Sequence, residues 1–157
     1  MTRLHDKAVT RWQALTRRCN VASANETLVR RAIEAIWNRG DLDVADELFA
    51  PGFVNHNGLV TDLVFGPEAI KISAAFYRLA FPDLHVTVEA LTTKEDIVVL
   101  CWTARRSSAD EPEDDAFTAS QTLLTGVTRS RLADGKIAES WTEWNRVQAL
   151  HDLGSAG

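Results

Sequence analysis

Apolar residues in the first half of the chain recur every three or four positions, which is the spacing of helices with one buried face. This pattern covers residues 4–19, 28–37 and 70–81. Ser23 and Glu26 have the spacing of a capping box and predict that the second helix begins at Ser23. Gly40 is expected to end that helix as a left-handed cap, and Gly66-Pro67-Glu68 is typical of the start of the third helix.

After Pro82 the pattern changes to the alternation of strands. Residues 97–104 are apolar on both faces and predict a central strand that is covered on both sides. Residues 118–132 form a long predicted strand, and the tight-turn pair Asp134-Gly135 sends the chain back along it. Helices followed by antiparallel hairpins predict an α+β fold, in which a cone-shaped curved antiparallel sheet packs around the N-terminal helices.

The last predicted strand, residues 136–145, carries two carboxylates and two indoles. A regular strand divides its side chains between two faces. One face would hold Ile137, Glu139, Trp141 and Glu143, and the other would hold Ala138, Ser140, Thr142 and Trp144. The pattern leaves open which face points inward, so that a cavity wall and an ordinary surface strand are both consistent with it.

A chain of 157 residues with 45% hydrophobic residues is expected to form one domain, residues 21–154, preceded by an N-terminal amphipathic helical extension, residues 1–20. The formal charge of −5 argues against nucleic acid or an anionic membrane as the partner. The helix of residues 4–19 is expected to pack on the domain or on a partner, and a membrane-surface helix or an interaction module is the alternative.

Two cysteines, Cys19 and Cys101, lie far apart in the sequence and predict reduced thiols and a cytoplasmic protein. The four histidines show no metal-ligand spacing, so we expect no protein-bound metal. A sheet with apolar residues on both faces needs a cover on its outer side. A homodimer is the simplest cover, because dimers are the commonest oligomers.

Several segments, taken in order, resemble the SnoaL-like polyketide cyclases. They are Asn38-Arg39-Gly40-Asp41, Phe49-Ala50-Pro51 with Val54-Asn55-His56, Gly66 to Ile70, Ala80 to Leu84, Asp134 to Trp141, and Leu150 to Gly154. The resemblance spans roughly residues 25–154. This family belongs to the nuclear-transport-factor-two-like superfamily of α+β cones, so the resemblance implies the fold more strongly than the reaction.

The resemblance implies cofactor-free acid–base chemistry, in which an enolate attacks a carbonyl to close a ring. Glu143 stands where similar enzymes place a cavity carboxylate and is the first candidate for the general acid or base. Asn55 and His56 are candidates to donate to a substrate carbonyl, and His56 could also move a proton. The competing interpretation is a solvated Glu143 and a histidine that is merely hydrogen-bonded in the wall.

The candidate substrate-binding residues are Trp102, Trp141, Tyr77, Phe81 and Gln121, and plain core packing is the alternative for each aromatic residue. Family members often carry histidine where Ser140 stands, and several carry aspartate on the long strand where this chain has Thr125, Gly126 and Thr128. The resemblance and the aromatic candidates together predict a cofactor-independent cyclase or isomerase for a hydrophobic secondary-metabolite intermediate. The alternative is a non-catalytic small-molecule-binding or accessory protein on the same scaffold.

Overall fold

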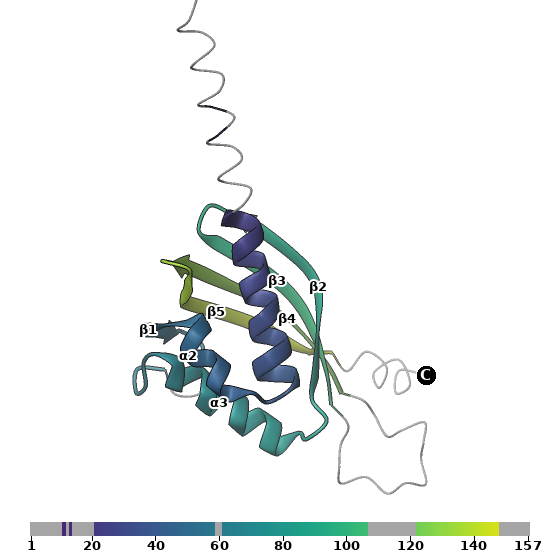
Figure 1. The fold of residues 1–157 in the computed structure, drawn as a ribbon. Coiled ribbons are helices and arrows are strands. Elements are labelled where there is room, and N and C mark those ends of the chain that lie inside the picture. Colours follow the sequence, from purple (N-terminus) through teal and green to yellow (C-terminus); the bar gives the residue numbers. More distant parts are fainter. Residues whose placement is uncertain (1–10, 12, 14–20, 59–60, 107–121, 148–157) are drawn as a thin grey trace, which may run out of the picture.

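A computed structural model describes residues 11, 13, 21–58, 61–106 and 122–147. Within these residues one curved five-stranded sheet is covered by helices on its concave side (Figure 1). The strand order is β1-β5-β4-β3-β2; β1 is parallel to β5 and the other neighbours are antiparallel. The strands are β1 (Phe49–Asn55), β2 (His85–Lys94), β3 (Ile97–Arg106), β4 (Thr122–Ala133) and β5 (Lys136–Val147). The predicted α+β class is confirmed.

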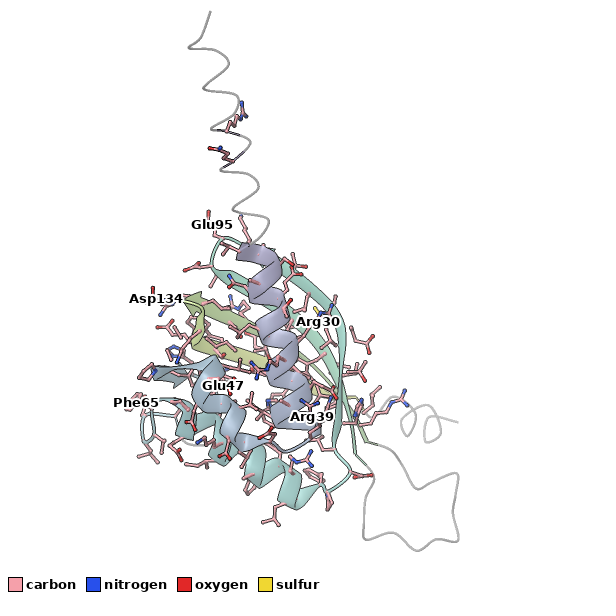
Figure 2. The ribbon with its side chains drawn as sticks, viewed as in Figure 1. Arg30, Arg39, Glu47, Phe65, Glu95 and Asp134 are labelled. Carbon is pink, nitrogen blue, oxygen red and sulfur yellow. The ribbon has the colours of Figure 1, made fainter. Side chains whose placement is uncertain are left out.

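The helical layer consists of residues 21–32, which are α-helical, and of four further elements. These are the π-helix η1 (Ile33–Asn38), the 3-10 helix η2 (Leu42–Val44), α2 (Ala45–Leu48) and α3 (Pro67–Ala80). Charged side chains such as Arg30 and Glu47 are exposed on the outside of this layer (Figure 2). None of the helices described here is long and apolar enough to cross a membrane.

The predicted start of the second helix is wrong, while its predicted end is confirmed. Val21 and Ala22 are already helical, so Ser23 does not stand at an N-cap. The Thr27 hydroxyl donates to the Ser23 carbonyl, and Glu26 accepts a hydrogen bond from Thr93 on β2 instead of reaching back. Gly40 adopts φ +73° after η1, as a left-handed cap requires.

Polar side chains tie the end of η1 to the sheet edge and to α3. Asn38 receives a hydrogen bond from the Val86 backbone N–H and donates one to the Val86 carbonyl, at 2.7 and 2.9 Å. Arg78 on α3 donates from Nη1 to the carbonyls of Trp37 and Asn38. These bonds satisfy carbonyls at the helix end that have no partner within the helix, and they hold η1, α3 and β2 together around one space.

A β-bulge interrupts the β4–β5 pairing two residues after the turn. Leu132 pairs with Ile137, but Arg131 pairs with Glu139, so Ala138 is an extra residue on β5. A bulge of one residue reverses which face the following side chains occupy. Ile137 therefore shares the helix-covered face with Ser140, and the predicted grouping of Ile137 with Glu139 is wrong.

Candidate active site

A cavity of about 190 Å³ lies between the helices and the inner face of the sheet. An apolar cavity of roughly 150 Å³ is enough to hold benzene, so this space suits a small ring system. Its apolar walls include Ile33, Trp37, Phe49, Ile70, Leu84 and Leu100. Asn57 and Trp144 line the cavity and are also exposed, so the cavity reaches the solvent beside them.

Three side chains on neighbouring strands form a chain of hydrogen bonds in the cavity wall. Trp102 Nε1 on β3 donates to Thr128 Oγ1 on β4 over 3.0 Å, and the hydroxyls of Thr128 and Thr142 on β5 lie 2.9 Å apart. An indole can only donate, so Thr128 accepts from it. The two hydroxyls share one bond between them, which leaves one O–H free to donate. Because all three residues line the cavity, a ligand oxygen can accept that hydrogen.

Gly126 provides the space in which the Trp102 indole lies. The two residues pair across β3 and β4, and a Cβ added at Gly126 would lie 2.2 Å from Trp102 Cζ2. Any larger residue at position 126 would displace the indole from Thr128.

Two further sets of hydroxyls line the cavity. Ser130 and Ser140 face each other across β4 and β5 with their hydroxyls 3.2 Å apart, and both residues are buried. Ser73 enters from α3, is buried, and its Oγ has no hydrogen-bond partner. The inner face of the sheet therefore presents neutral hydroxyl groups to an otherwise apolar space.

Four of the predicted site residues line this cavity and three do not. Asn55, Tyr77, Phe81 and Trp102 are part of the lining. Trp141, His56 and Glu143 are not, because the bulge at Ala138 turns Trp141 and Glu143 to the outer face and His56 lies beside Trp141. Glu143 is exposed and pairs with Val127. The expectation that Glu143 reaches the cavity is therefore corrected. Gln121 lies outside the described residues.

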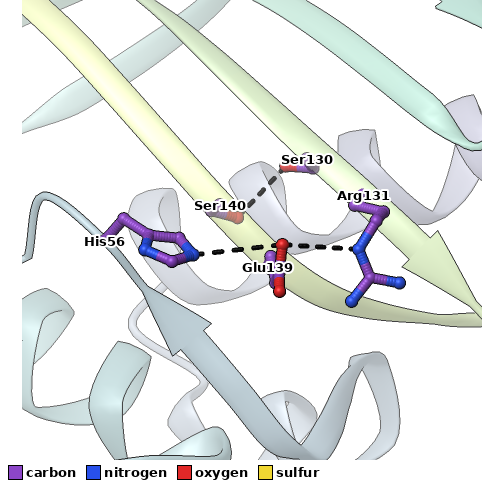
Figure 3. A network of polar contacts seen from close by, with 5 residues as sticks. All are labelled: His56, Ser130, Arg131, Glu139 and Ser140. Atoms are coloured by element: carbon purple, nitrogen blue, oxygen red, sulfur yellow. Dashed lines mark hydrogen bonds and ion pairs between the residues drawn. The ribbon is translucent and has the colours of Figure 1, made fainter. Parts of the chain in front are cut away.

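His56 and Trp141 belong to a separate polar cluster on the outer face (Figure 3 shows its polar contacts). The two rings are stacked, with centroids 4.7 Å apart and an interplanar angle of 1°. Glu139 Oε2 lies 3.9 Å from His56 Nε2 and 3.4 Å from Arg131 Nε. The nearby Ser130–Ser140 contact belongs to the opposite face, because alternate residues of a strand point to opposite sides.

The described lining of the cavity offers few side chains that could act as an acid or a base. Among the lining residues that the structure describes, Tyr77 is the only one with a titratable side chain, and no carboxylate or imidazole is present. The residues that sequence reasoning missed are Thr128, Thr142, Ser130, Ser140, Ser73 and Trp144. The hydroxyl residues of β4 and β5 stand opposite one another only because Ala138 is an extra residue on β5. A regular hairpin register, without this bulge, pairs them with other residues and does not predict the hydroxyl pairs.

A curved sheet closed over helices around an internal cavity defines the α+β cone of the nuclear-transport-factor-two-like superfamily. A family model described as SnoaL-like polyketide cyclase matches residues 27–153. The chain belongs to this family. A search of curated proteins gave no match.

Solved structures with the same fold come from several bacteria. IdmH of Streptomyces antibioticus, a proposed polyketide cyclase, is 29% identical with a TM-score of 0.67 and covers 83% of this chain and 98% of its own. A proposed polyketide cyclase of Acidithiobacillus ferrooxidans is 18% identical with a TM-score of 0.68, over 85% of this chain and 96% of its own. AclR of Streptomyces galilaeus, a proposed hydroxylase, is 24% identical with a TM-score of 0.62, over 85% and 97% of the two chains.

Proposed function

We propose that this protein binds a hydrophobic, oxygenated secondary-metabolite intermediate in the cavity and closes a ring in it without a cofactor. The observation that carries the proposal is the Trp102–Thr128–Thr142 chain, which leaves one O–H donor in an apolar wall. Hydrogen bonds in such a chain polarise one another and act more strongly where water is excluded. A carbonyl oxygen that accepts this hydrogen bond is therefore activated.

The proposed reaction uses donors and shape in place of a cavity carboxylate. A methylene group between two carbonyls loses a proton. The resulting enolate carbon then attacks the carbon of a further ketone to form the new C–C bond. The Thr128–Thr142 hydroxyl donates to the oxygen on which negative charge develops, a contribution that is often worth about 10²–10³ in turnover. Water at the open side of the cavity, beside Asn57 and Trp144, takes the proton from the methylene group and returns a proton to the alkoxide that the attack forms, so that the product is a neutral alcohol. The apolar walls hold the chain folded with its reacting carbons in contact.

The second candidate is the non-catalytic binding or accessory protein on the same scaffold. The observation that favours it is the composition of the described lining, which contains no carboxylate and no imidazole. Such a protein would shelter a reactive intermediate from water and would leave it unchanged. The two candidates share the ligand and differ only in whether the ligand is converted.

One assay separates the two candidates. The purified protein is mixed with aromatic 1,3-diketones that carry a further ketone within reach of six-membered ring closure. Calorimetry measures binding, and mass spectrometry with ultraviolet absorbance measures the cyclic product. Ring closure faster than in buffer, saturating with the diketone, supports the cyclase. Stoichiometric binding at the buffer rate of closure would reject it in favour of the binding protein, and no binding would reject both.

A further inference from the structure

Ser73 is the one buried side-chain nitrogen or oxygen donor or acceptor in the described part of the chain that has no hydrogen-bond partner. Serine within a helix commonly donates to the carbonyl of the residue four positions earlier, but Ser73 Oγ makes no such bond. Buried polar groups are otherwise satisfied in proteins, and a specific exception calls for an explanation. The position of Ser73 in the cavity wall suggests one.

The surroundings of Ser73 give no structural reason for a hydroxyl. Ser73 is 3% exposed, and the buried residues near it on α3 are Ala69, Ile70 and Ala74. Alanine at position 73 would match these neighbours and is a better helix former than serine. Both Ser73 and Tyr77 line the cavity, and residues four apart share one helical face. The hydroxyl therefore has no partner within the described part of the protein and faces the space that a ligand would fill.

We infer that Ser73 Oγ binds an oxygen atom of the ligand, and that the preferred ligand carries oxygen at two separate positions, one at α3 and one at the sheet. The second position is set by the hydroxyls of Thr128 and Thr142 on β4 and β5. A serine hydroxyl both donates and accepts, so it can bind either a ketone or a hydroxyl group. This inference rests on the cavity being a ligand site, as proposed above, but not on ring closure.

Three probes with the same ring system distinguish the two proposed oxygen positions, one at α3 and one at the sheet. Naphthalene has no oxygen, 1-naphthol has one, and 1,5-dihydroxynaphthalene has one on each ring. Their affinities for the full-length wild-type protein are compared with those for Ser73→Ala by calorimetry. A neutral hydrogen bond is worth about 3- to 10-fold in affinity. Wild-type protein should bind the diol about that much more tightly than 1-naphthol, and Ser73→Ala should bind the two equally.

The free protein supplies a second measurement, because a structural role predicts the opposite result. If the hydroxyl serves a ligand, Ser73→Ala should melt at the same temperature as the wild type or higher, and its affinity for naphthalene should not change. A lower melting temperature with unchanged preference for the diol would overturn the inference. Naphthalene binding without any preference for the diol in the wild type would also overturn it while leaving the cavity as a binding site. No binding of any probe would overturn both.

Discussion

The two faces of the β4–β5 hairpin both carry polar residues, but of different kinds. The inner face has the neutral pairs Thr128–Thr142 and Ser130–Ser140. The outer face has the charged pair Arg131–Glu139, together with Glu143. A hydroxyl can be buried if it finds one hydrogen bond, whereas a lone charge in an apolar space is far more costly. Among the described residues, the inner face therefore offers neutral hydroxyl groups to the cavity, and the charged side chains of this hairpin lie on the outer face.

The largest expected effect comes from placing a charge on the inner face. Ser130→Asp buries a carboxylate beside Ser140 without a cation, and it should lower the free energy of unfolding by about 3 kcal/mol or more. Burial disfavours the charged form and raises the pKa of the new aspartate, so the ionisation penalty should decline as the pH falls towards about 4, the ordinary pKa of aspartate, and should be absent below it, where the carboxyl is neutral in both states. Urea unfolding at several pH values measures this.

Arg129→Asp is the matched control, because Arg129 is exposed on the outer face of the same strand. Its cost should stay within about 1 kcal/mol, which is the range of strand propensities. Equal costs for the two aspartates would contradict the distinction between the faces.

A smaller loss of stability is expected from filling the space that the Trp102 indole occupies beside Gly126. Gly126→Ala places a methyl group against the indole and should lower the free energy of unfolding by about 1–3 kcal/mol through overpacking. It should also shift the tryptophan fluorescence and weaken ligand binding, because the indole leaves Thr128. Gly52→Ala is the control, since no atom lies within 4 Å of its added Cβ. A stable Gly126→Ala protein with unchanged fluorescence would show that Gly126 does not set the position of Trp102.

Much of the fold follows from local patterns in the sequence. Gly66-Pro67 begins α3, and the turn at Asp134 and Gly135, both with positive φ, joins β4 to β5 as predicted. The aromatic residues Trp102 and Tyr77 line the cavity, because large apolar side chains on inner faces line whatever space is enclosed, and their role in substrate binding stays a prediction. The homodimer and the N-terminal extension stay predictions.

The face of β5 was not predictable from alternation, because one extra residue, Ala138, reverses it. The bulge turns Thr142 towards the cavity and Glu143 towards the outer face. The proposed chemistry therefore uses a threonine hydroxyl and not the glutamate. No turn residue or glycine marks the bulge in the sequence, so only the pairing with β4 reveals it. The sequence also does not reveal the role of Ser73. It lies among apolar residues of α3, and only the structure shows that its hydroxyl has no hydrogen-bond partner.

The most direct test of the account compares Thr142→Val with Glu143→Gln, two neighbouring residues on opposite faces of β5. Thr142→Val keeps the shape of the side chain and removes the hydroxyl. Because Thr128 would still carry a free O–H, the variant is combined with Thr128→Val, and this double variant should slow ring closure of the diketone substrates by about 10²-fold, as expected for the loss of the donor to a developing oxyanion. Glu143→Gln should leave both binding and ring closure at the wild-type level. Full activity in the Thr128→Val, Thr142→Val double variant together with loss of activity in Glu143→Gln would contradict the account and return the chemistry to the outer carboxylate.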